Sequence, residues 1–137
     1  MTTTFISTRI ITDDIDTLVS FYEHITGARA AWSTEDFAEI HTGRATLAIG
    51  STRTVPLFGA GSADPAHNRS AILEFLVSDV DMEWDRLKHS LDTVVTEPTT
   101  MPWGNRALIF RDPDGNLVNL FTPVTPDARL RFGLTRD

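Results

Sequence analysis

Two titratable side chains that stand two residues apart could move a proton on a bound molecule. Glu39 and His41 fall within the segment Phe37–His41, which is predicted as a strand, and alternate residues of a strand point to the same face. A carboxylate and an imidazole that share a face can serve as an acid/base pair. A solvated or interface strand face is the alternative interpretation of the same pattern.

Several bulky apolar side chains occur on predicted strand ends and loops rather than on helices. Their surfaces suit contact with a planar ligand, although they could equally fill gaps in the core or in a dimer interface. Trp103 is the strongest candidate, because Pro102-Trp103-Gly104 places an indole in a rigid loop, whereas Trp84 is expected in the core. The candidate set comprises Trp32, Phe37, Phe58, Met101 and Trp103.

Length, composition and charge narrow the classes of function. A chain of 137 residues with 41% hydrophobic and 23% charged residues is expected to form one globular domain. The net charge of −7 argues against nucleic acid and would favour a cationic small molecule, although a solvated acidic surface explains it as well. The chain has no cysteine, no signal-like start and no apolar run long enough for a membrane span, so we expect a cytoplasmic protein without a membrane partner.

The first half of the chain shows a strand, a helix and three further strands. A strand over Phe5–Ile11 precedes a helix over Ile15–Ile25, which Asp14 can cap and Gly27 can end. The helix carries one apolar stripe, formed by Ile15, Leu18, Val19, Tyr22 and Ile25. The strands that follow are predicted over Ala28–Trp32, Phe37–His41 and Thr46–Gly50.

The second half repeats this order. A strand over Ile72–Val77 is followed by a helix whose apolar stripe is Val80, Trp84, Leu87 and Leu91. Further strands are predicted over Thr93–Thr96, Asn105–Phe110 and Leu117–Thr122. Residues 51–69 are rich in Gly, Pro, Ser and Ala and are predicted as a linker. The tail from Thr125 onward is predicted to be an extension or partly disordered.

Residues 110–121, Phe-Arg-Asp-Pro-Asp-Gly-Asn-Leu-Val-Asn-Leu-Phe, are the most distinctive stretch. Pro113 and Gly115 favour a tight turn between two strands. This hairpin, with Phe21-Tyr22 in the first helix and Pro102-Trp103-Gly104 before the penultimate strand, resembles the vicinal oxygen chelate superfamily. That superfamily includes glyoxalase I, extradiol dioxygenases, fosfomycin-resistance enzymes and bleomycin-binding proteins.

The resemblance covers roughly residues 5–123 and implies an α+β fold of two βαβββ modules. The modules would span about 5–50 and 70–123, and their sheets would curl around a cavity with the helices on the outer face. Strand alternation then assigns the last strand. Val118 and Leu120 should face a helix, while Leu117, Asn119 and Phe121 should line the cavity.

The resemblance also bears on metal chemistry, because metal ligands in this superfamily are inward-facing residues of the first and last strands of each module. The corresponding positions are Ser7, Ala48, Ile72 and Asn119, and these residue types do not chelate a divalent metal. A shift of the alignment by two residues would bring Glu74 inward, but one carboxylate is too few ligands for a divalent metal. We therefore expect no metal and no cofactor, and no glyoxalase, dioxygenase or fosfomycin-transferase activity.

Arg9 and Ser7 share the implied inward face. Arg9 could bind a ligand carbonyl or carboxylate, or it could pair with Glu74, whereas Ser7 has no evident histidine for a catalytic triad. With the aromatic set above, the expected ligand-binding residues are Ser7, Arg9, Trp32, Phe37, His41, Phe58, Met101, Trp103 and Asn119.

The resemblance favours a metal-free homodimer that sequesters a hydrophobic or aromatic antibiotic or natural product, and we expect this ligand to be planar and aromatic or cationic. The first alternative is a cofactor-independent isomerase, cyclase or lyase that uses His41, Glu39 or Arg9 for proton transfer. A metal-dependent lyase or dioxygenase is a third interpretation, and it requires the assignment of at least two strands to be wrong.

Overall fold

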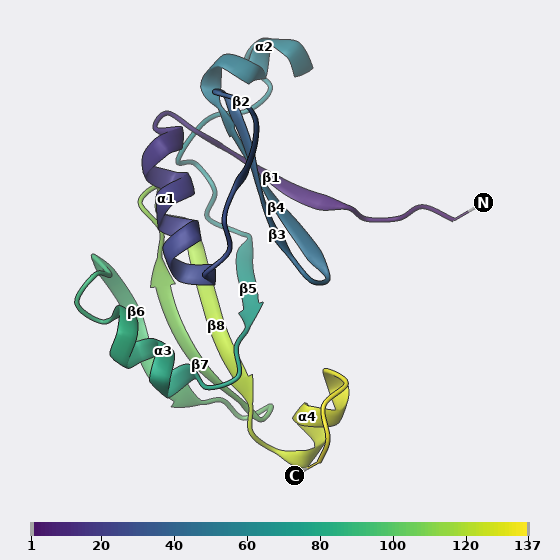
Figure 1. Ribbon diagram of the computed structural model, residues 1–137, viewed down its shortest axis with the longest axis vertical. Helices are drawn as coiled ribbons and strands as arrows, with labels where there is room; N and C mark the ends of the chain where they lie inside the picture. The colour runs from purple at the N-terminus through teal and green to yellow at the C-terminus, as the bar shows by residue number, and fades with distance from the viewer. Residues whose placement is uncertain (1, 137) are drawn as a thin grey trace. The chain divides into compact units, whose positions relative to one another are not determined.

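The computed structural model describes residues 2–136 and divides the chain into two compact units, Met1–Asn68 and Arg69–Asp137. Each unit contains one four-stranded sheet. Figure 1 shows that, within each unit, a helix lies along one face of the sheet.

The first unit has the order β1 (Ser7–Thr12), α1 (Ile15–Thr26), β2 (Ala31–Thr34), β3 (Phe37–Thr42) and β4 (Ala45–Ser51). Its sheet has the strand order β1-β4-β3-β2, in which β1 runs parallel to β4 and the other neighbours are antiparallel. The second unit repeats the pattern with β5 (Ile72–Leu76), α3 (Val80–Leu87), β6 (Thr93–Thr100), β7 (Asn105–Arg111) and β8 (Leu117–Pro123) in the order β5-β8-β7-β6. The expected α+β fold of two βαβββ modules is confirmed; neither sheet closes into a barrel.

Helix α1 forms for the local reasons that the sequence indicates. The carboxylate of Asp14 accepts a hydrogen bond from the Thr17 amide at 3.2 Å, and Gly27 ends the helix in the left-handed conformation with φ of 74°. The five stripe residues are buried, and α1 contacts β3 and β4. The sheet side chains buried on this side are Ala38, Ile40, Leu47 and Ile49.

Helix α3 is shorter than its apolar pattern predicts. It ends at Leu87, which is fully buried with Val80, whereas Leu91 lies beyond the helix. Trp84 is only half-buried, which corrects its expected place in the core. On β8, Val118 and Leu120 are buried as predicted, since they lie on the helix side of the second sheet.

The hairpin between β7 and β8 is held by one buried carboxyl group. Asp112 accepts hydrogen bonds from the backbone amides of Asp114 and Asn116, both at 2.9 Å, and from the Asn116 side chain at 2.8 Å. Gly115 adopts a φ of 85°, which a side chain would strain. The predicted turn is confirmed.

Some boundaries and two connecting segments differ from the predictions. The predicted linker begins with a short 3₁₀ turn (Thr52–Thr54) and helix α2 (Val55–Phe58), and the tail forms α4 (Pro126–Arg131). Strand β2 begins three residues later than predicted, and β6 extends to Thr100. Among the described residues, no helix is long and apolar enough to span a membrane.

Candidate functional site

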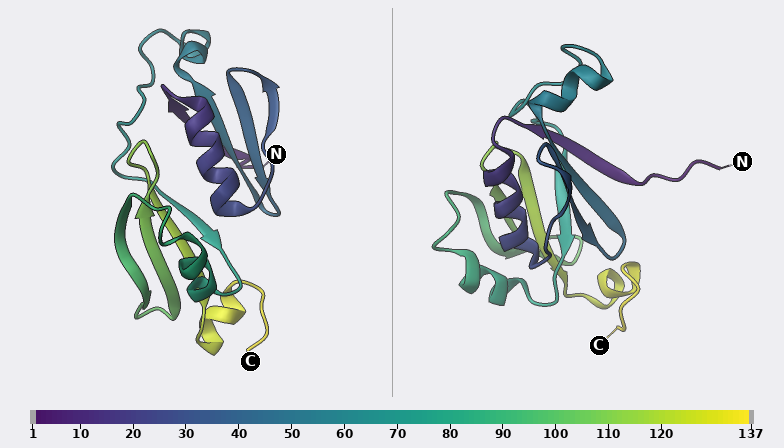
Figure 2. Two further views of the ribbon diagram at one scale, coloured as in Figure 1. Left: turned by 60° about the vertical axis from the view of Figure 1, so that its left-hand side comes forward. Right: turned by 45° about the horizontal axis from the view of Figure 1, so that its top comes forward.

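The first sheet has a face that points away from α1, which we call its inner face. Side chains alternate along each strand, and the register pairs Arg9 and Glu39 with the same residue, Ala48. The views in Figure 2 show α1 on the other side of these strands. The inner face is formed by Ser7, Arg9, Ile11, Phe37, Glu39, His41, Thr46, Ala48 and Gly50.

The guanidinium of Arg9 lies against two aromatic rings on the inner face. Its guanidinium carbon lies 4.2 Å from the ring centroid of Phe37 and 5.0 Å from that of Phe58. Both distances fall within the range of cation–π attraction. Phe58 comes from α2, which was predicted as linker, and its side chain is 65% exposed. The structure therefore brings together three of the residues that the sequence proposed separately.

Glu39 and His41 also share the inner face, as the strand pattern predicts. The Glu39 Oε1 and His41 Nε2 atoms are 4.0 Å apart, which is an ion-pair distance rather than a hydrogen bond. The Nδ1 atom of His41 lies 3.1 Å from the Thr46 hydroxyl. The hydroxyl thus orients the imidazole, while Glu39 stands near its other nitrogen. Ser7 lies on this face too, and the register pairs it with Thr46 on β4.

The second sheet presents a comparable inner face, the one that points away from α3. Asn119 is paired there with Glu74, and its side-chain amide donates a hydrogen bond to the Glu74 carboxylate at 2.9 Å. The Asn119 Oδ1 atom is buried and accepts no hydrogen bond. Ile72 occupies the same face two residues earlier, so Glu74 is directed inward without any shift of the alignment. Its hydrogen-bond partner within the second unit is Asn119, and the pairing of Glu74 with Arg9 stays a prediction.

These inner faces do not provide a set of metal ligands. The strand positions that correspond to the metal-ligand positions of the superfamily hold Ser7, Ala48, Ile72 and Asn119. Glu74, two residues after Ile72 on the same face, adds only one carboxylate. A divalent ion needs several imidazole, carboxylate or thiolate ligands. Across residues 2–136, no three His, Asp or Glu side chains are placed to hold a metal ion. The residues do not fit the family's metal, and absence of metal from the protein stays a prediction.

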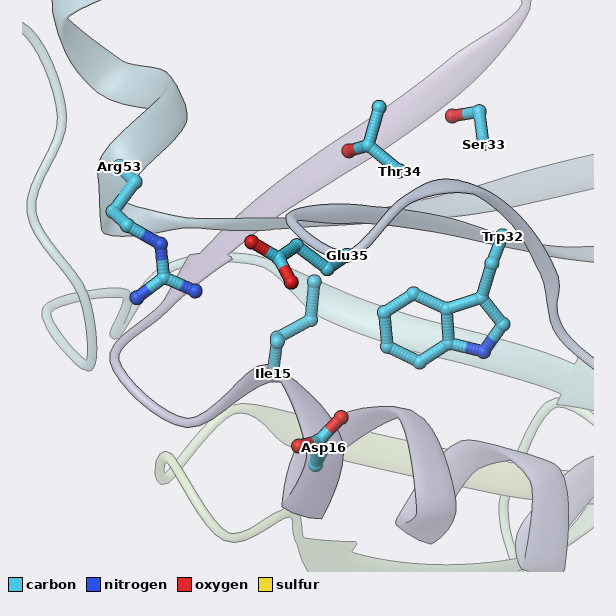
Figure 3. Close-up of a pocket in the computed structure, with 7 residues that line it drawn as sticks. All are labelled: Ile15, Asp16, Trp32, Ser33, Thr34, Glu35 and Arg53. Carbon is cyan, nitrogen blue, oxygen red and sulfur yellow. The ribbon is translucent and has the colours of Figure 1, made fainter.

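Trp32 lies elsewhere, on the helix side of the first sheet. The register pairs it with Ala38, a residue buried beneath α1, so Trp32 and Phe37 point to opposite faces. Its indole is 44% exposed and forms one wall of an open hollow of about 560 Å³. Figure 3 shows the indole beside Ile15 and Asp16, at the start of α1. The hollow is lined by Ile15, Asp16, Trp32, Ser33, Thr34, Glu35 and Arg53.

Charged residues that the sequence did not single out shape this hollow. Arg53 binds Asp36 at 2.6 Å, and the Ser51 hydroxyl donates to the same carboxylate at 2.8 Å. These two hydrogen bonds, that of Arg53 first, lower the pKa of the Asp36 carboxyl, and Asp36 in turn raises the pKa of Arg53. The pairing fixes the turn before β3. Arg53 and Asp36 are 17 residues apart and meet only in the folded protein, so no local sequence pattern predicts this ion pair.

Met101 and Trp103 belong to the connection between β6 and β7 in the second unit. The Met101 amide donates to the Asn105 carbonyl at 2.7 Å, and the Gly104 amide donates to the Met101 carbonyl at 3.0 Å. These bonds make the loop rigid, as Pro102-Trp103-Gly104 suggests. Trp103 is 61% exposed on this loop. Of the nine expected ligand-binding residues, Ser7, Arg9, Phe37, His41 and Phe58 are grouped at the first inner face, while Asn119 lies on the second.

Comparisons with known proteins agree with this architecture. The family model described as Glyoxalase/Bleomycin resistance protein/Dioxygenase superfamily matches residues 4–120. No curated protein matches the chain. Among solved structures, a protein of unknown function from Agrobacterium tumefaciens is 23% identical, with 89% of this chain and 95% of that chain covered and a TM-score of 0.76.

Two further structures carry the family description. A glyoxalase/bleomycin resistance protein/dioxygenase from Nocardioides is 20% identical, with coverage of 90% of this chain and 85% of that one and a TM-score of 0.71. A glyoxalase/bleomycin resistance protein/dioxygenase family enzyme from Burkholderia phytofirmans is 18% identical, with coverage of 86% and 97% and a TM-score of 0.75. At these identities the likeness concerns the fold.

Proposed function

We propose that this chain, which belongs to the Glyoxalase/Bleomycin resistance protein/Dioxygenase superfamily, is a metal-free cytoplasmic protein that binds and sequesters a hydrophobic, partly aromatic antibiotic or natural product. The observation that carries the proposal is the character of the inner faces. The strand positions that hold metal ligands in the family carry Ser7, Ala48, Ile72 and Asn119. On the first inner face, the guanidinium of Arg9 and the rings of Phe37 and Phe58 lie beside them.

The first inner face is suited to a flat molecule. Phe58 is largely exposed although a phenyl ring gains free energy from burial, and Phe37 is half-exposed beside it. Ala48 and Gly50 on β4 are buried beneath the longer side chains of this face, which include Arg9 and Ile11. A planar ring system could cover this surface and exclude water from both phenyl groups.

Recovery of the natural ligand tests this function. The protein should be isolated under non-denaturing conditions from a host that produces aromatic natural products, and its mass should be measured with any bound ligand. We expect a chemically unchanged aromatic compound and less than stoichiometric zinc, nickel, iron and manganese by elemental analysis. About one metal ion per chain, removable with loss of binding, would contradict the proposal.

A matched pair of variants locates the ligand on the protein. Phe58→Ala should reduce the retained ligand, because it removes the exposed ring beside Arg9. Leu57→Ala serves as the control, since Leu57 is the preceding residue of α2 and is 87% exposed. Equal retention by the two variants would remove the first inner face from the proposed site.

The Glu39–His41 arrangement favours one alternative, a cofactor-independent isomerase, cyclase or lyase. A carboxylate 4.0 Å from an imidazole that a hydroxyl orients is a recognisable acid/base arrangement. Under this alternative the recovered compound would change in mass or in structure on incubation with the protein. Glu39→Gln would abolish the conversion, and His89→Gln, at an exposed site after α3, would leave it unchanged.

A further inference from the structure

The side chain of Arg9 crosses the first sheet to reach its aromatic partners. Arg9 lies on β1 and Phe37 on β3, with β4 between them, so their backbones are separated by two strand spacings, roughly 10 Å. The side chain passes Gly50 on β4. A Cβ atom on Gly50 would come within 3.9 Å of the Arg9 Cδ atom and within 3.1 Å of the Thr54 hydroxyl.

The aromatic contacts fix the guanidinium but leave its hydrogen-bonding capacity unused. A guanidinium carries five N–H donors in its plane, and contact with ring faces consumes none of them. Among the described residues of the first unit, 2–68, no carboxylate lies within ion-pair distance of Arg9. Within the first unit, Arg9 is therefore a cation that two aromatic rings orient and that no carboxylate neutralises.

The nearest carboxylate on the same face does not fill this role. Glu39 is paired with Ala48 across from Arg9, but its carboxylate lies beside His41. Ser7 and Thr46 provide hydroxyl groups on the same face and no further charge. An incoming anion would thus meet one guanidinium and two phenyl rings.

We infer that Arg9, held over Phe37 and Phe58, recognises a planar anionic group of the ligand, a carboxylate or phenolate conjugated to an aromatic ring. This inference rests on the proposed function and specifies the ligand's chemical class. Arg binds a planar carboxylate through two parallel hydrogen bonds, and the attached ring would stack on Phe58. The net charge of −7 favours a cationic ligand at long range, but the local charge at Arg9 determines which group is bound here.

Two probes of nearly equal size test the inference. 2-Naphthoate and 2-naphthamide share their ring system and differ in the negative charge, and their affinities can be compared by calorimetric titration. We expect naphthoate to bind the parent protein about tenfold more tightly than naphthamide, because a hydrogen bond to a charged group is stronger than one to a neutral group. Amide shifts in NMR spectra should locate both probes on β1 and β3.

Variants of Arg9 distinguish the effect of the planar guanidinium from the effect of positive charge alone. Arg9→Met should abolish the preference for naphthoate, and Arg9→Lys should restore only part of it, because an ammonium lacks the planar fork. Arg29→Met changes the net charge equally at an exposed position after α1 and should keep the preference. Phe58→Ala should weaken both probes. Thermal unfolding of each variant establishes that the fold is retained.

The outcomes separate this inference from the function on which it rests. Equal affinity for the two probes, or a preference that survives Arg9→Met, would overturn the inference and leave an aromatic binding protein in place. Failure of both probes to bind at millimolar concentration would overturn the inference and count against the first inner face as a binding surface.

Discussion

The three tryptophans of this chain have different surroundings, and these predict different effects of substitution. Trp103 is exposed on the rigid loop before β7, Trp32 lines the hollow beside α1, and Trp84 is half-buried on α3. A residue that contributes little to the core can be removed without loss of the fold, so Trp103 offers a clean test of ligand contact.

We expect Trp103→Ala to leave the free energy of unfolding nearly unchanged and to weaken binding of a planar aromatic ligand that quenches tryptophan fluorescence. A stacked ring contributes about 1 kcal/mol beyond its buried area. Trp84→Ala should mainly lower stability, by less than the roughly 3–5 kcal/mol of a fully buried aromatic residue. Loss of the ligand in Trp84→Ala alone, at unchanged stability, would show that the two roles are reversed.

The Asp36–Arg53 pair predicts a pH-dependent contribution to stability. Because folding lowers the pKa of Asp36 below 3.8, the pair stabilises the folded state above that value and loses its effect as the pH falls through the folded pKa. Asp36→Asn should therefore lower the urea midpoint at neutral pH, and the difference from the parent should shrink toward pH 3 and below. A difference that persists in strong acid would point to a cause other than ionisation.

At the level of elements, Gly104 joins the loop before β7 to the start of α4. Its carbonyl accepts hydrogen bonds from the amides of Val124 and Thr125, at 2.8 and 3.3 Å, and its φ is 93°. A Cβ atom here would collide with the side chain of Thr125, the residue whose hydroxyl caps α4. This approach holds the start of α4 against the loop before β7, a contact that the mixed composition of the tail did not indicate.

We expect Gly104→Ala to destabilise the protein by about 2–3 kcal/mol and to expose α4 to proteolysis. Gly115→Ala is the matched control, because Gly115 also has a positive φ but has open space around it. That control should cost only about 1 kcal/mol. Similar losses from the two substitutions, measured by urea unfolding, would mean that backbone conformation and not the collision with Thr125 is responsible.

The hairpin of β7 and β8 depends on the side chain of Asp112. Asp112→Ala removes three hydrogen bonds and leaves the buried Asn116 amide without this acceptor, so we expect a loss of about 2–4 kcal/mol in the free energy of unfolding. Asp13→Ala, which removes an exposed carboxylate before α1, should change stability by no more than about 0.5 kcal/mol. Equal effects would contradict the structural role of Asp112.

For the whole molecule we predict a homodimer. Two-fold dimers are the commonest assembly of soluble proteins, and exposed apolar residues such as Ile72 and Leu76 on the second inner face would gain from being covered. Light scattering at micromolar concentration should give twice the chain mass of 15.2 kDa. A mass of 15.2 kDa under these conditions would contradict the prediction.

The sequence by itself determined the elements that local chemistry controls. The stripe of α1, its Asp14 cap and its Gly27 end specify a helix without reference to the rest of the chain, because each acts within a few residues. The same holds for the turn from Asp112 to Asn116. The Asp112 carboxylate closes this turn by accepting a hydrogen bond from the Asn116 amide, only four residues away. Strand alternation likewise placed Glu39 and His41 on one face, and Val118 and Leu120 on the other side from Asn119.

Only the tertiary structure decided which of these residues meet. Trp32 and Phe37 were both expected to bind the ligand, but β2 pairs with β3 so that Trp32 lies opposite Ala38 and its side chain is on the α1 side of the sheet. Phe58 of α2 lies 5.0 Å from the Arg9 guanidinium, and Asn119 meets Glu74 because β5 and β8 are parallel neighbours. Each of these contacts joins segments distant in sequence, so its register depends on the packing of the whole sheet and not on any local pattern.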